Sequence, residues 1–266
     1  MYSRLLNSLG VLALLLFCGI AWADANLMYW GDRGINKIQR ANLDGSNVED
    51  VVTGYIAWGI ALDPEVGKVY WISGGQSVRR ADLDGSNVES LVTDLVNGRH
   101  IALDLRAGKM YWTEIGPVVP TDDGRIRRAD LDGTNVEIVF PTGNGSPFGI
   151  ALDLRAGKLY FSSNDGFLDR IQRANLDGSN LETIYTSNPN EPVLAIAVDP
   201  SFAKVYWTES NPDELLRANL NGTGVQTLIE PPISLDTELA VEFRGPGDRR
   251  SNGEGTREQP RRGPAA

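Results

Sequence analysis

Few side chains in this sequence are of the types that carry out acid–base or nucleophilic chemistry. His100 is the only histidine and Cys18 the only cysteine among 266 residues. A single histidine cannot form a metal centre with other histidines, so we expect a packing or hydrogen-bonding role for His100. No serine lies in a nucleophile-elbow sequence, and no glycine-rich phosphate loop precedes a helical pattern. The residue types therefore predict no catalytic group, no metal site and no cofactor.

Two acidic stretches, 82–87 and 130–135, share the pattern Asp-x-Asp-Gly-x-Asn, which invites comparison with a calcium loop. An EF-hand loop has acidic ligands at positions one, three and five, glycine at six and glutamate at twelve. Here glycine is the fourth residue, and related stretches recur at one place in every repeat described below. Asp, Gly and Asn in this order are typical of a hairpin turn. We therefore interpret both stretches as turns.

Most of the aromatic and charged signals recur along the chain, every 41 to 49 residues. An aromatic pair is followed by Arg-Ala, then by Leu-Asp-Gly, and later by Ile-Ala-Leu-Asp or a variant of it. The pairs are Tyr29-Trp30, Tyr70-Trp71, Tyr111-Trp112, Tyr160-Phe161 and Tyr206-Trp207, and the arginines are Arg40, Arg80, Arg128, Arg173 and Arg217. Because a catalytic residue is usually singular, we interpret the pairs as packing residues and the arginines as links within or between repeats.

Each repeat contains four short runs of β-forming residues separated by turn sequences. In one copy the runs cover residues 99–104, 110–113, 125–129 and 136–140. Four antiparallel strands in ~40–45 residues form a propeller blade, so the predicted fold class is an all-β propeller with five visible blades. The chain enters at a second strand, Leu27 to Trp30, and ends on a first strand, Leu239 to Phe243. We expect this C-terminal strand to complete the first blade and close the ring, which leaves no unpaired edge.

The aromatic pair, Arg-Ala-x-Leu-Asp-Gly and Ile-Ala-Leu-Asp together resemble the YWTD repeats (class B repeats) of the low-density lipoprotein receptor family. The resemblance covers residues 27–243. It implies a six-bladed template and a role in protein–protein binding, not catalysis, although five blades are visible here. The Thr-Asp that follows the family's aromatic pair is degraded, for example to Thr113-Glu114 and Ser162-Ser163. The strand count favours a closed five-blade ring over a ring that lacks a blade.

The two ends of the chain differ in composition from the repeats. Residues 1–23 read as a signal peptide, with Arg4, an apolar run from Leu9 to Ile20 and an Ala-x-Ala cleavage site. We therefore expect a secreted or periplasmic protein with no stable membrane insertion after cleavage, because the apolar run is too short to span a bilayer. The propeller occupies residues 24–243, and residues 244–266 form an Arg/Gly/Pro-rich disordered tail.

The charge of the propeller region excludes one class of partner. Residues 24–243 contain 18 Lys and Arg against 32 Asp and Glu, a net charge of −14. Binding of nucleic acid requires a basic surface, so we expect no nucleic-acid partner.

Loop variation points to one face of the ring. The loops between strands 2 and 3 and between successive blades carry the insertions, whereas the other two turns are nearly uniform. Function on a rigid scaffold usually lies in variable loops, although insertions also accumulate by drift. The candidate binding face comprises Trp58, Arg99, His100, Phe148 and Leu194 at the expected channel mouth, and Phe167 in a loop.

These features predict an exported binding module for a protein or a surface polymer. One alternative is a metal-dependent propeller enzyme of the lactonase or strictosidine-synthase-like type. Such enzymes place metal-binding Glu, Asn and Asp at the channel mouth, where the ten corresponding residues here include one acid, Glu238. A structural assembly scaffold is the other alternative.

Overall fold

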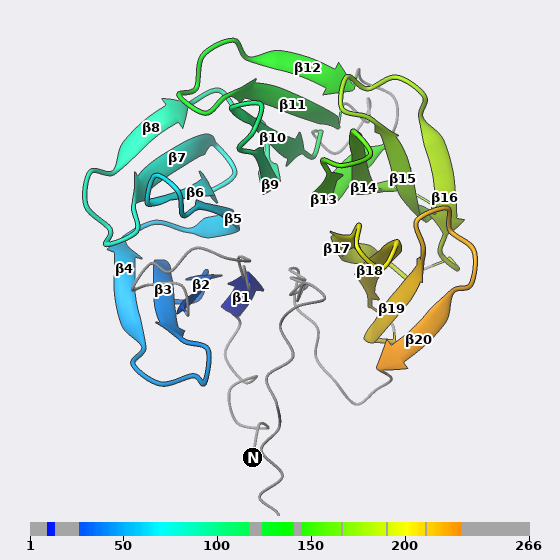
Figure 1. Cartoon of the computed structure of the whole chain (residues 1–266), viewed down its shortest axis with the longest axis horizontal. Helices are drawn as coiled ribbons and strands as arrows, with labels where there is room; N and C mark the ends of the chain where they lie inside the picture. The colour runs from blue at the N-terminus through cyan, green and yellow to red at the C-terminus, as the bar shows by residue number, and fades with distance from the viewer. Residues whose placement is uncertain are drawn as a thin grey trace, which may run out of the picture.

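The chain forms an all-β propeller. The computed structural model describes residues 10–13, 27–116, 124–140, 145–165, 167–189, 191–210 and 212–229. Within these ranges twenty strands form five antiparallel sheets of four strands, with no helix. The sheets are arranged as blades around a common centre (Figure 1). The predicted fold class and the four-stranded antiparallel blades are therefore confirmed.

The strands follow one another in chain order within each blade. Blade 1 contains β1 (Gly10–Ala13), β2 (Leu27–Asp32), β3 (Lys37–Asn42) and β4 (Glu49–Thr53). Blade 2 contains β5 (Ala57–Asp63), β6 (Lys68–Ser73), β7 (Ser77–Asp82) and β8 (Glu89–Val92). Blade 3 contains β9 (Gly98–Asp104), β10 (Lys109–Glu114), β11 (Arg125–Asp130) and β12 (Glu137–Phe140). Blade 4 contains β13 (Ser146–Asp153), β14 (Lys158–Asn164), β15 (Asp169–Asn175) and β16 (Glu182–Thr186). Blade 5 contains β17 (Val193–Asp199), β18 (Lys204–Glu209), β19 (Glu214–Asn219) and β20 (Gln226–Ile229).

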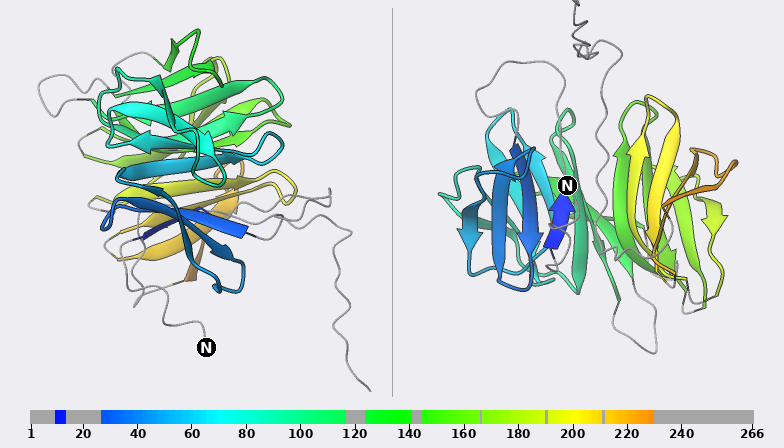
Figure 2. Two further views of the ribbon diagram at one scale, coloured as in Figure 1. Left: turned by 90° about the vertical axis from the view of Figure 1, so that its left-hand side faces the viewer. Right: turned by 90° about the horizontal axis from the view of Figure 1, so that it is seen from below.

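The first strand of each blade lies nearest the centre and the fourth lies at the rim (Figure 1). Seen from the side, the strands run between the two faces of the ring, so the loops gather on these faces (Figure 2). Turn residues with left-handed backbone separate the strands: Gly85 has φ of 85° and Asn87 has φ of 54°. Gly and Asn tolerate this region better than other residues, which explains why they recur in the turns.

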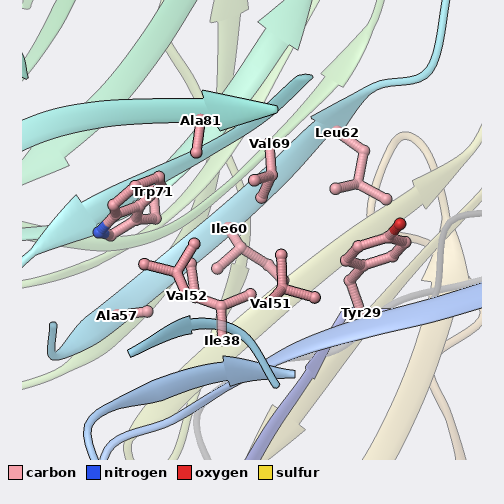
Figure 3. Packing of buried hydrophobic residues seen from close by; sticks show 10 residues of the cluster. All are labelled: Tyr29, Ile38, Val51, Val52, Ala57, Ile60, Leu62, Val69, Trp71 and Ala81. Atoms are coloured by element: carbon pink, nitrogen blue, oxygen red, sulfur yellow. The ribbon is translucent and has the colours of Figure 1, made fainter. Parts of the chain in front are cut away.

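The hydrophobic core is divided among the interfaces between neighbouring blades. Successive residues of a strand point to opposite faces of the sheet, so the two members of each aromatic pair serve different interfaces. Tyr29 of blade 1 packs in one cluster with Trp71 of blade 2 and with Val51 and Val52 of β4 (Figure 3). Tyr70 and Trp112 join blades 2 and 3 in the same way. Each blade thus needs a neighbour on both of its faces.

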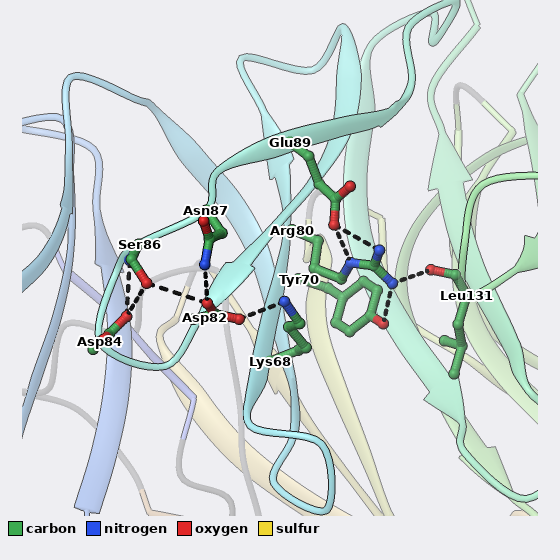
Figure 4. A network of polar contacts seen from close by, with 9 residues as sticks. All are labelled: Lys68, Tyr70, Arg80, Asp82, Asp84, Ser86, Asn87, Glu89 and Leu131. Atoms are coloured by element: carbon green, nitrogen blue, oxygen red, sulfur yellow. Dashed lines mark hydrogen bonds and ion pairs between the residues drawn. The ribbon is translucent and has the colours of Figure 1, made fainter.

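The repeated arginines connect each blade to the next. The Arg80 guanidinium donates hydrogen bonds to the hydroxyl of Tyr70 and to the carbonyl of Leu131 in blade 3, at 3.2 Å and 3.0 Å. It also pairs with Glu89 of its own blade, 2.6 Å away (Figure 4). Arg40, Arg128 and Arg173 bond the carbonyls of Leu83, Leu176 and Leu220. Arg217, in the last blade, contacts the side chain of Gln226 instead.

Blade 1 differs from the sequence-based prediction at its inner strand. Leu239 to Phe243 was expected there, but that segment lies outside the described residues. The structure places β1 in this position, antiparallel to β2, with Gly10 opposite Asp32 and Ala13 opposite Tyr29. The strand therefore comes from the segment that the sequence assigns to the signal peptide. An unpaired edge of β2 accepts any short apolar extended segment, since a ladder is made by the backbone.

The two ends of the blade series remain partly uncovered. Tyr206 and Trp30 are half-buried, whereas their equivalents in the other blades are at most 4% exposed. Leu228 and Ile229 of β20 are 40% and 44% exposed, although the equivalent Val51 and Val52 are buried. No packing between blades 5 and 1 comparable to the other four interfaces occurs among the described residues. The described part of the chain is therefore an arc of five blades.

The buried aromatic pairs set the first prediction. Trp112 is fully buried between blades 2 and 3, so Trp112→Ala should lower the free energy of unfolding by about 3–5 kcal/mol. Arg106→Ala, in an exposed turn, should cost less than about 0.5 kcal/mol. Chemical denaturation of both variants measures this difference, and a mild effect of Trp112→Ala would contradict the interface packing.

Candidate functional site

A β-bulge at the start of four first strands shapes the mouth of the channel. In blade 2, Ala57 pairs with Ser73 and Ile60 with Trp71, so two residues, 58 and 59, lie opposite the single residue 72. The same shift occurs in β9, β13 and β17. A bulge bends the strand and redirects a side chain. The residues at the first bulged position are Trp58, Arg99, Phe148 and Leu194, which are all half-buried.

Hydroxyl groups on the second strands support three of these bulges. A bulge leaves one backbone N–H outside the regular ladder. Thr113 Oγ1 accepts the N–H of His100 at 3.1 Å, and Ser162 Oγ accepts that of Gly149 at 2.9 Å. Thr208 Oγ1 does the same for Ala195 at 3.2 Å. In these three blades the residue directly after the aromatic pair therefore supports the bulge, whereas blade 2 forms the same bulge opposite Ile72.

Four of the six predicted face residues lie together. The Arg99 guanidinium carbon is 4.1 Å from the centroid of the Trp58 ring and 6.0 Å from that of Phe148. The His100 ring lies 5.2 Å from the Phe148 ring, and His100 Nδ1 is 2.9 Å from the Phe148 carbonyl oxygen. His100 is 9% exposed, so it is largely inside the wall of the mouth. Cation–π and ring contacts thus link residues from blades 2, 3 and 4.

The other two predicted residues are placed differently. Leu194 occupies the equivalent bulge position in blade 5, and its carbonyl oxygen would lie 3.0 Å from a Cβ at Gly149, so a side chain there would require the neighbouring strand to shift slightly. Phe167 is 84% exposed in the loop between β14 and β15, where its N–H bonds Asp165. No ring contact joins Phe167 to the channel mouth among the described residues.

Arg33 belongs to the channel mouth but was not predicted from the sequence. It lies in the loop between β2 and β3, and its guanidinium carbon is 4.4 Å from the Trp58 ring centroid. Burial, together with the charge of Arg33, lowers the pKa of Arg99. The one indication of this role in the sequence is that Arg33 does not occupy the position of the repeated arginines.

The acidic residue two positions after the aromatic pair has a different environment in different blades. In blade 3, Glu114 is 1% exposed and accepts a hydrogen bond from Trp112 Nε1 at 2.8 Å. Arg125 and Arg127 also bind its carboxylate, at 2.7 Å and 3.1 Å. Arg127 in turn pairs with Asp94 and lowers the pKa of that carboxyl. Glu114 is therefore a fully compensated buried charge.

Glu209 is the equivalent residue in blade 5, and it has no such compensation. Trp207 Nε1 donates a hydrogen bond to it at 3.0 Å, but no ion pair of Glu209 is found among the described residues. Burial raises the pKa of Glu209, although hydrogen bonds from Trp207 and Tyr185 oppose this shift. The pKa of Tyr185 is raised by its burial and by the nearby Glu209.

The repeated acidic turns lie on the opposite, uniform face. Asp82 accepts hydrogen bonds from Lys68, Asn87 and Ser86, and these bonds, led by that of Lys68, lower its pKa to about 2 (Figure 4). The carboxylates of the turn therefore bind neighbouring protein groups. The described residues contain no group of three or more His, Cys, Asp or Glu arranged to hold a metal ion. They also include no helix long and apolar enough to cross a membrane.

Solved structures with similar folds have diverse roles. The chain is similar to a chain of a nidogen/laminin complex, with 21% identity over 82% of each chain and a TM-score of 0.70. It also resembles a gluconolactonase from Xanthomonas campestris, with 18% identity, a TM-score of 0.65 and coverage of 85% of this chain and 77% of that one. A TolB-like protein from Agrobacterium tumefaciens has 17% identity over 78% of each chain and a TM-score of 0.63. These likenesses support the propeller fold.

No protein-family model matches the sequence, and no curated protein does either. The function must therefore be argued from the residues of this chain.

The contrast between Glu209 and Glu114 gives the second prediction. Because burial raises the folded-state pKa of Glu209, its protonated form stabilises the fold. This contribution is complete below the unfolded pKa of about 4.3 and is lost as pH rises through the folded pKa. Glu209→Gln should therefore raise the melting temperature at pH 7 and remove part of the dependence of stability on pH.

Glu114→Gln is the matched control and should have the opposite effect. It leaves Arg125 and Arg127 without their shared carboxylate, which should cost about 3 kcal/mol. Thermal melts of both variants from about pH 4, near the unfolded carboxyl pKa of about 4.3, to about pH 8 provide the measurement. Equal destabilisation by the two substitutions would refute the environment described for Glu209.

Proposed function

We propose that this protein is an exported, non-catalytic binding module of the YWTD type, which captures a protein through the channel mouth and the loops around it. The observation that supports this most directly is the bulge shared by β5, β9, β13 and β17. A conserved backbone feature presents four chemically different side chains at equivalent positions. The aromatic pair, Arg-Ala and Leu-Asp-Gly carry nearly the same residue in every blade. Variation at a ring of partly exposed positions is expected where a partner is recognised.

The chemistry of these side chains suits a protein or a surface polymer. Trp58 and Phe148 offer aromatic surface, Arg99 offers a planar, positively charged guanidinium group, and Leu194 is apolar. Aromatic residues and arginine are the side chains that most often dominate protein interfaces. The signal-peptide sequence supports a secreted or periplasmic location, where such a partner would be met.

The third prediction tests this face. Arg99→Glu, or Phe148→Ala combined with Phe167→Ala, should abolish capture of partners from the envelope fraction and the culture medium. Loss of a central aromatic or arginine contact typically weakens binding by 2 kcal/mol or more, which is about thirtyfold. Pull-down with the mature protein, quantified by mass spectrometry, is the measurement, and circular dichroism should show that the fold is intact.

Variants of the uniform face provide the control. Arg155→Glu and Ser179→Ala change exposed residues of that face and should leave capture unchanged. Loss of capture in these variants, with capture retained by Arg99→Glu, would place the binding site on the opposite face.

A propeller enzyme is the second candidate, favoured by the similarity in fold to a gluconolactonase. A metal-dependent enzyme of this kind would gain stability from its metal, so EDTA would lower its melting temperature and a divalent ion would restore it. For a binding module we expect no effect of EDTA and no turnover of lactone or ester substrates. A stoichiometric divalent ion at the channel mouth would overturn the binding-module proposal.

We also propose that the mature chain completes blade 1 with Leu239 to Phe243. In the structure β1 occupies this edge, but cleavage after residue 23 would remove it. The sequence Leu239-Ala-Val-Glu corresponds to Ile60-Ala-Leu-Asp of β5, which pairs with β6 in the register required. Closure of the ring would also cover Trp30 and Tyr206. An assembly scaffold, in which blade 5 packs on blade 1 of another copy, would cover the same residues.

The fourth prediction concerns this edge. Stopping the mature chain after Ile233 should cause aggregation or a large loss of thermal stability, because it leaves β2 unpaired. Stopping it after Arg244 should have no effect. The unprocessed chain stopped after Ile233 keeps β1 and should melt at a higher temperature than the processed one. Identical melting of the two truncated mature chains would contradict the proposal.

The effect of the substitution Trp30→Ala on stability distinguishes a closed ring from an open arc of blades. In a closed ring it should cost about as much as Trp112→Ala, about 3–5 kcal/mol. Light scattering shows whether a second copy supplies the cover, because an assembly would then exceed the mass of one chain.

A further inference from the structure

The pair of arginines around Trp58 is the feature of the channel mouth that protein stability does not explain. The guanidinium carbons of Arg33 and Arg99 lie 4.4 Å and 4.1 Å from the same ring centroid. Their separation is therefore smaller than the sum of these two distances, and two like charges at such range repel each other. Burial of Arg99 adds to the cost.

Neither arginine has a carboxylate partner within the described part of the chain. Among the described residues, Arg99 donates one hydrogen bond, to the Gly98 carbonyl at 3.3 Å, and Arg33 has one ring contact, with Trp58, and no hydrogen bond or ion pair from its side chain. By contrast, Arg40, Arg80, Arg128 and Arg173 each pair with a glutamate. The propeller region contains 32 acidic residues. The lack of a described carboxylate partner for Arg33 or Arg99 therefore does not reflect a shortage of acidic residues in the sequence.

The carboxylates at the ends of neighbouring second strands are engaged elsewhere. Asp32, next to Arg33 in the chain, accepts the N–H groups of Gly34 and Ile35 at 2.9 Å and 3.2 Å. Glu114 is bound by Arg125 and Arg127. Among the described residues, the carboxylates of these strand ends therefore do not neutralise the charge of the two arginines.

We propose that Arg33, Trp58 and Arg99 form a clamp for the carboxylate of an Asp or Glu side chain on the bound partner. This rests on the function proposed above and names the chemistry of the ligand. A carboxylate accepts charge-assisted hydrogen bonds of about 2.7–2.9 Å from a guanidinium, and its two oxygens allow one anion to bind two arginines at once. Its arrival would relieve the repulsion between the arginines, and the Trp58 ring holds both guanidinium groups in place beforehand.

The surroundings favour an isolated carboxylate over a polyanion. The propeller region has a net charge of −14, which repels a densely charged polymer such as nucleic acid or a sulfated polysaccharide. Phe148, 6.0 Å from Arg99, offers apolar contact beside the clamp, and Leu194 occupies the equivalent bulge position in the blade after that of Phe148. The ligand that fits is a peptide segment with one acidic side chain between apolar ones.

The test starts from a random nine-residue peptide library displayed on phage and selected on the mature protein. Wild-type protein should enrich peptides with one Asp or Glu flanked by apolar residues. The double variant Arg33→Gln with Arg99→Gln should not. The most enriched peptide is then synthesised with Asp or Glu and with the matching Asn or Gln, and calorimetry measures both affinities.

Loss of the ligand's carboxylate, or of either arginine, should weaken binding at least about tenfold. In the doubly substituted protein, the acidic and amide peptides should bind equally. Arg155→Gln, an exposed arginine of the uniform face, is the matched control and should bind the acidic peptide as the wild type does. Added salt should weaken binding of the acidic peptide more than that of the amide form.

Four outcomes would overturn the proposal. Enrichment of peptides without an acidic residue is one. Equal binding of the acidic and amide peptides by the wild type is another. A melting temperature lowered strongly by Arg33→Gln would assign the arginines to stability, since removal of one like charge should leave stability equal or higher. Binding of tetragalacturonate in place of the peptides would assign the clamp to an acidic polysaccharide.

The result also separates this inference from the proposed function. If partner capture depends on Phe148 and Phe167 but not on Arg33, the binding face stands and the clamp fails. If no substitution on the face alters capture, the proposed function itself fails.

Discussion

The structure depends on the burial of both faces of every blade. Adjacent residues of a strand point in opposite directions, so Tyr70 faces blade 3 while Trp71 faces blade 1. A single four-stranded sheet cannot cover both faces, and stability must come from stacking it between two others. The blades at the two ends lack one neighbour, which is visible in the partial exposure of Trp30, Leu228 and Ile229. Whatever covers these residues in solution completes the core.

The polar links between blades follow the same repeat and fix its register. An arginine at one position of the third strand reaches the carbonyl of the leucine in the next blade's turn, four times in succession. The same guanidinium pairs with a glutamate on the fourth strand. These contacts engage the guanidinium groups of Arg40, Arg80, Arg128 and Arg173 on two sides, as expected for residues that link blades. Side chains at positions that the repeated motif does not specify can then differ from blade to blade, and several of them lie at the bulges.

Much of the fold could be predicted from the sequence because each contact is repeated. The strand order, the turns and the burial of Trp71, Trp112 and Trp207 follow from alternation and from Asp-Gly turns. The proximity of Trp58, Arg99 and Phe148 follows from their equivalent positions at the first-strand starts. The position of Arg33 could not be predicted, because it depends on the conformation of one loop. The pairing of residues 10–13 with β2 was also missed, since the apolar pattern of a signal peptide does not reveal an edge-strand partner.

The distinction between repeated and singular residues separates stability from recognition in this molecule. Thr113, Ser162 and Thr208 recur because each accepts the N–H that a bulge leaves free. The bulge that each of them supports presents one side chain whose type is not set by the repeated motif. Blades with the same backbone structure thereby carry different side chains at the bulge positions. The local charge at these positions can therefore be opposite in sign to the net charge of the propeller. Within the described part of this acidic propeller, two arginines lie against one tryptophan without a carboxylate partner. A carboxylate from a bound partner would offset the electrostatic cost of this arrangement.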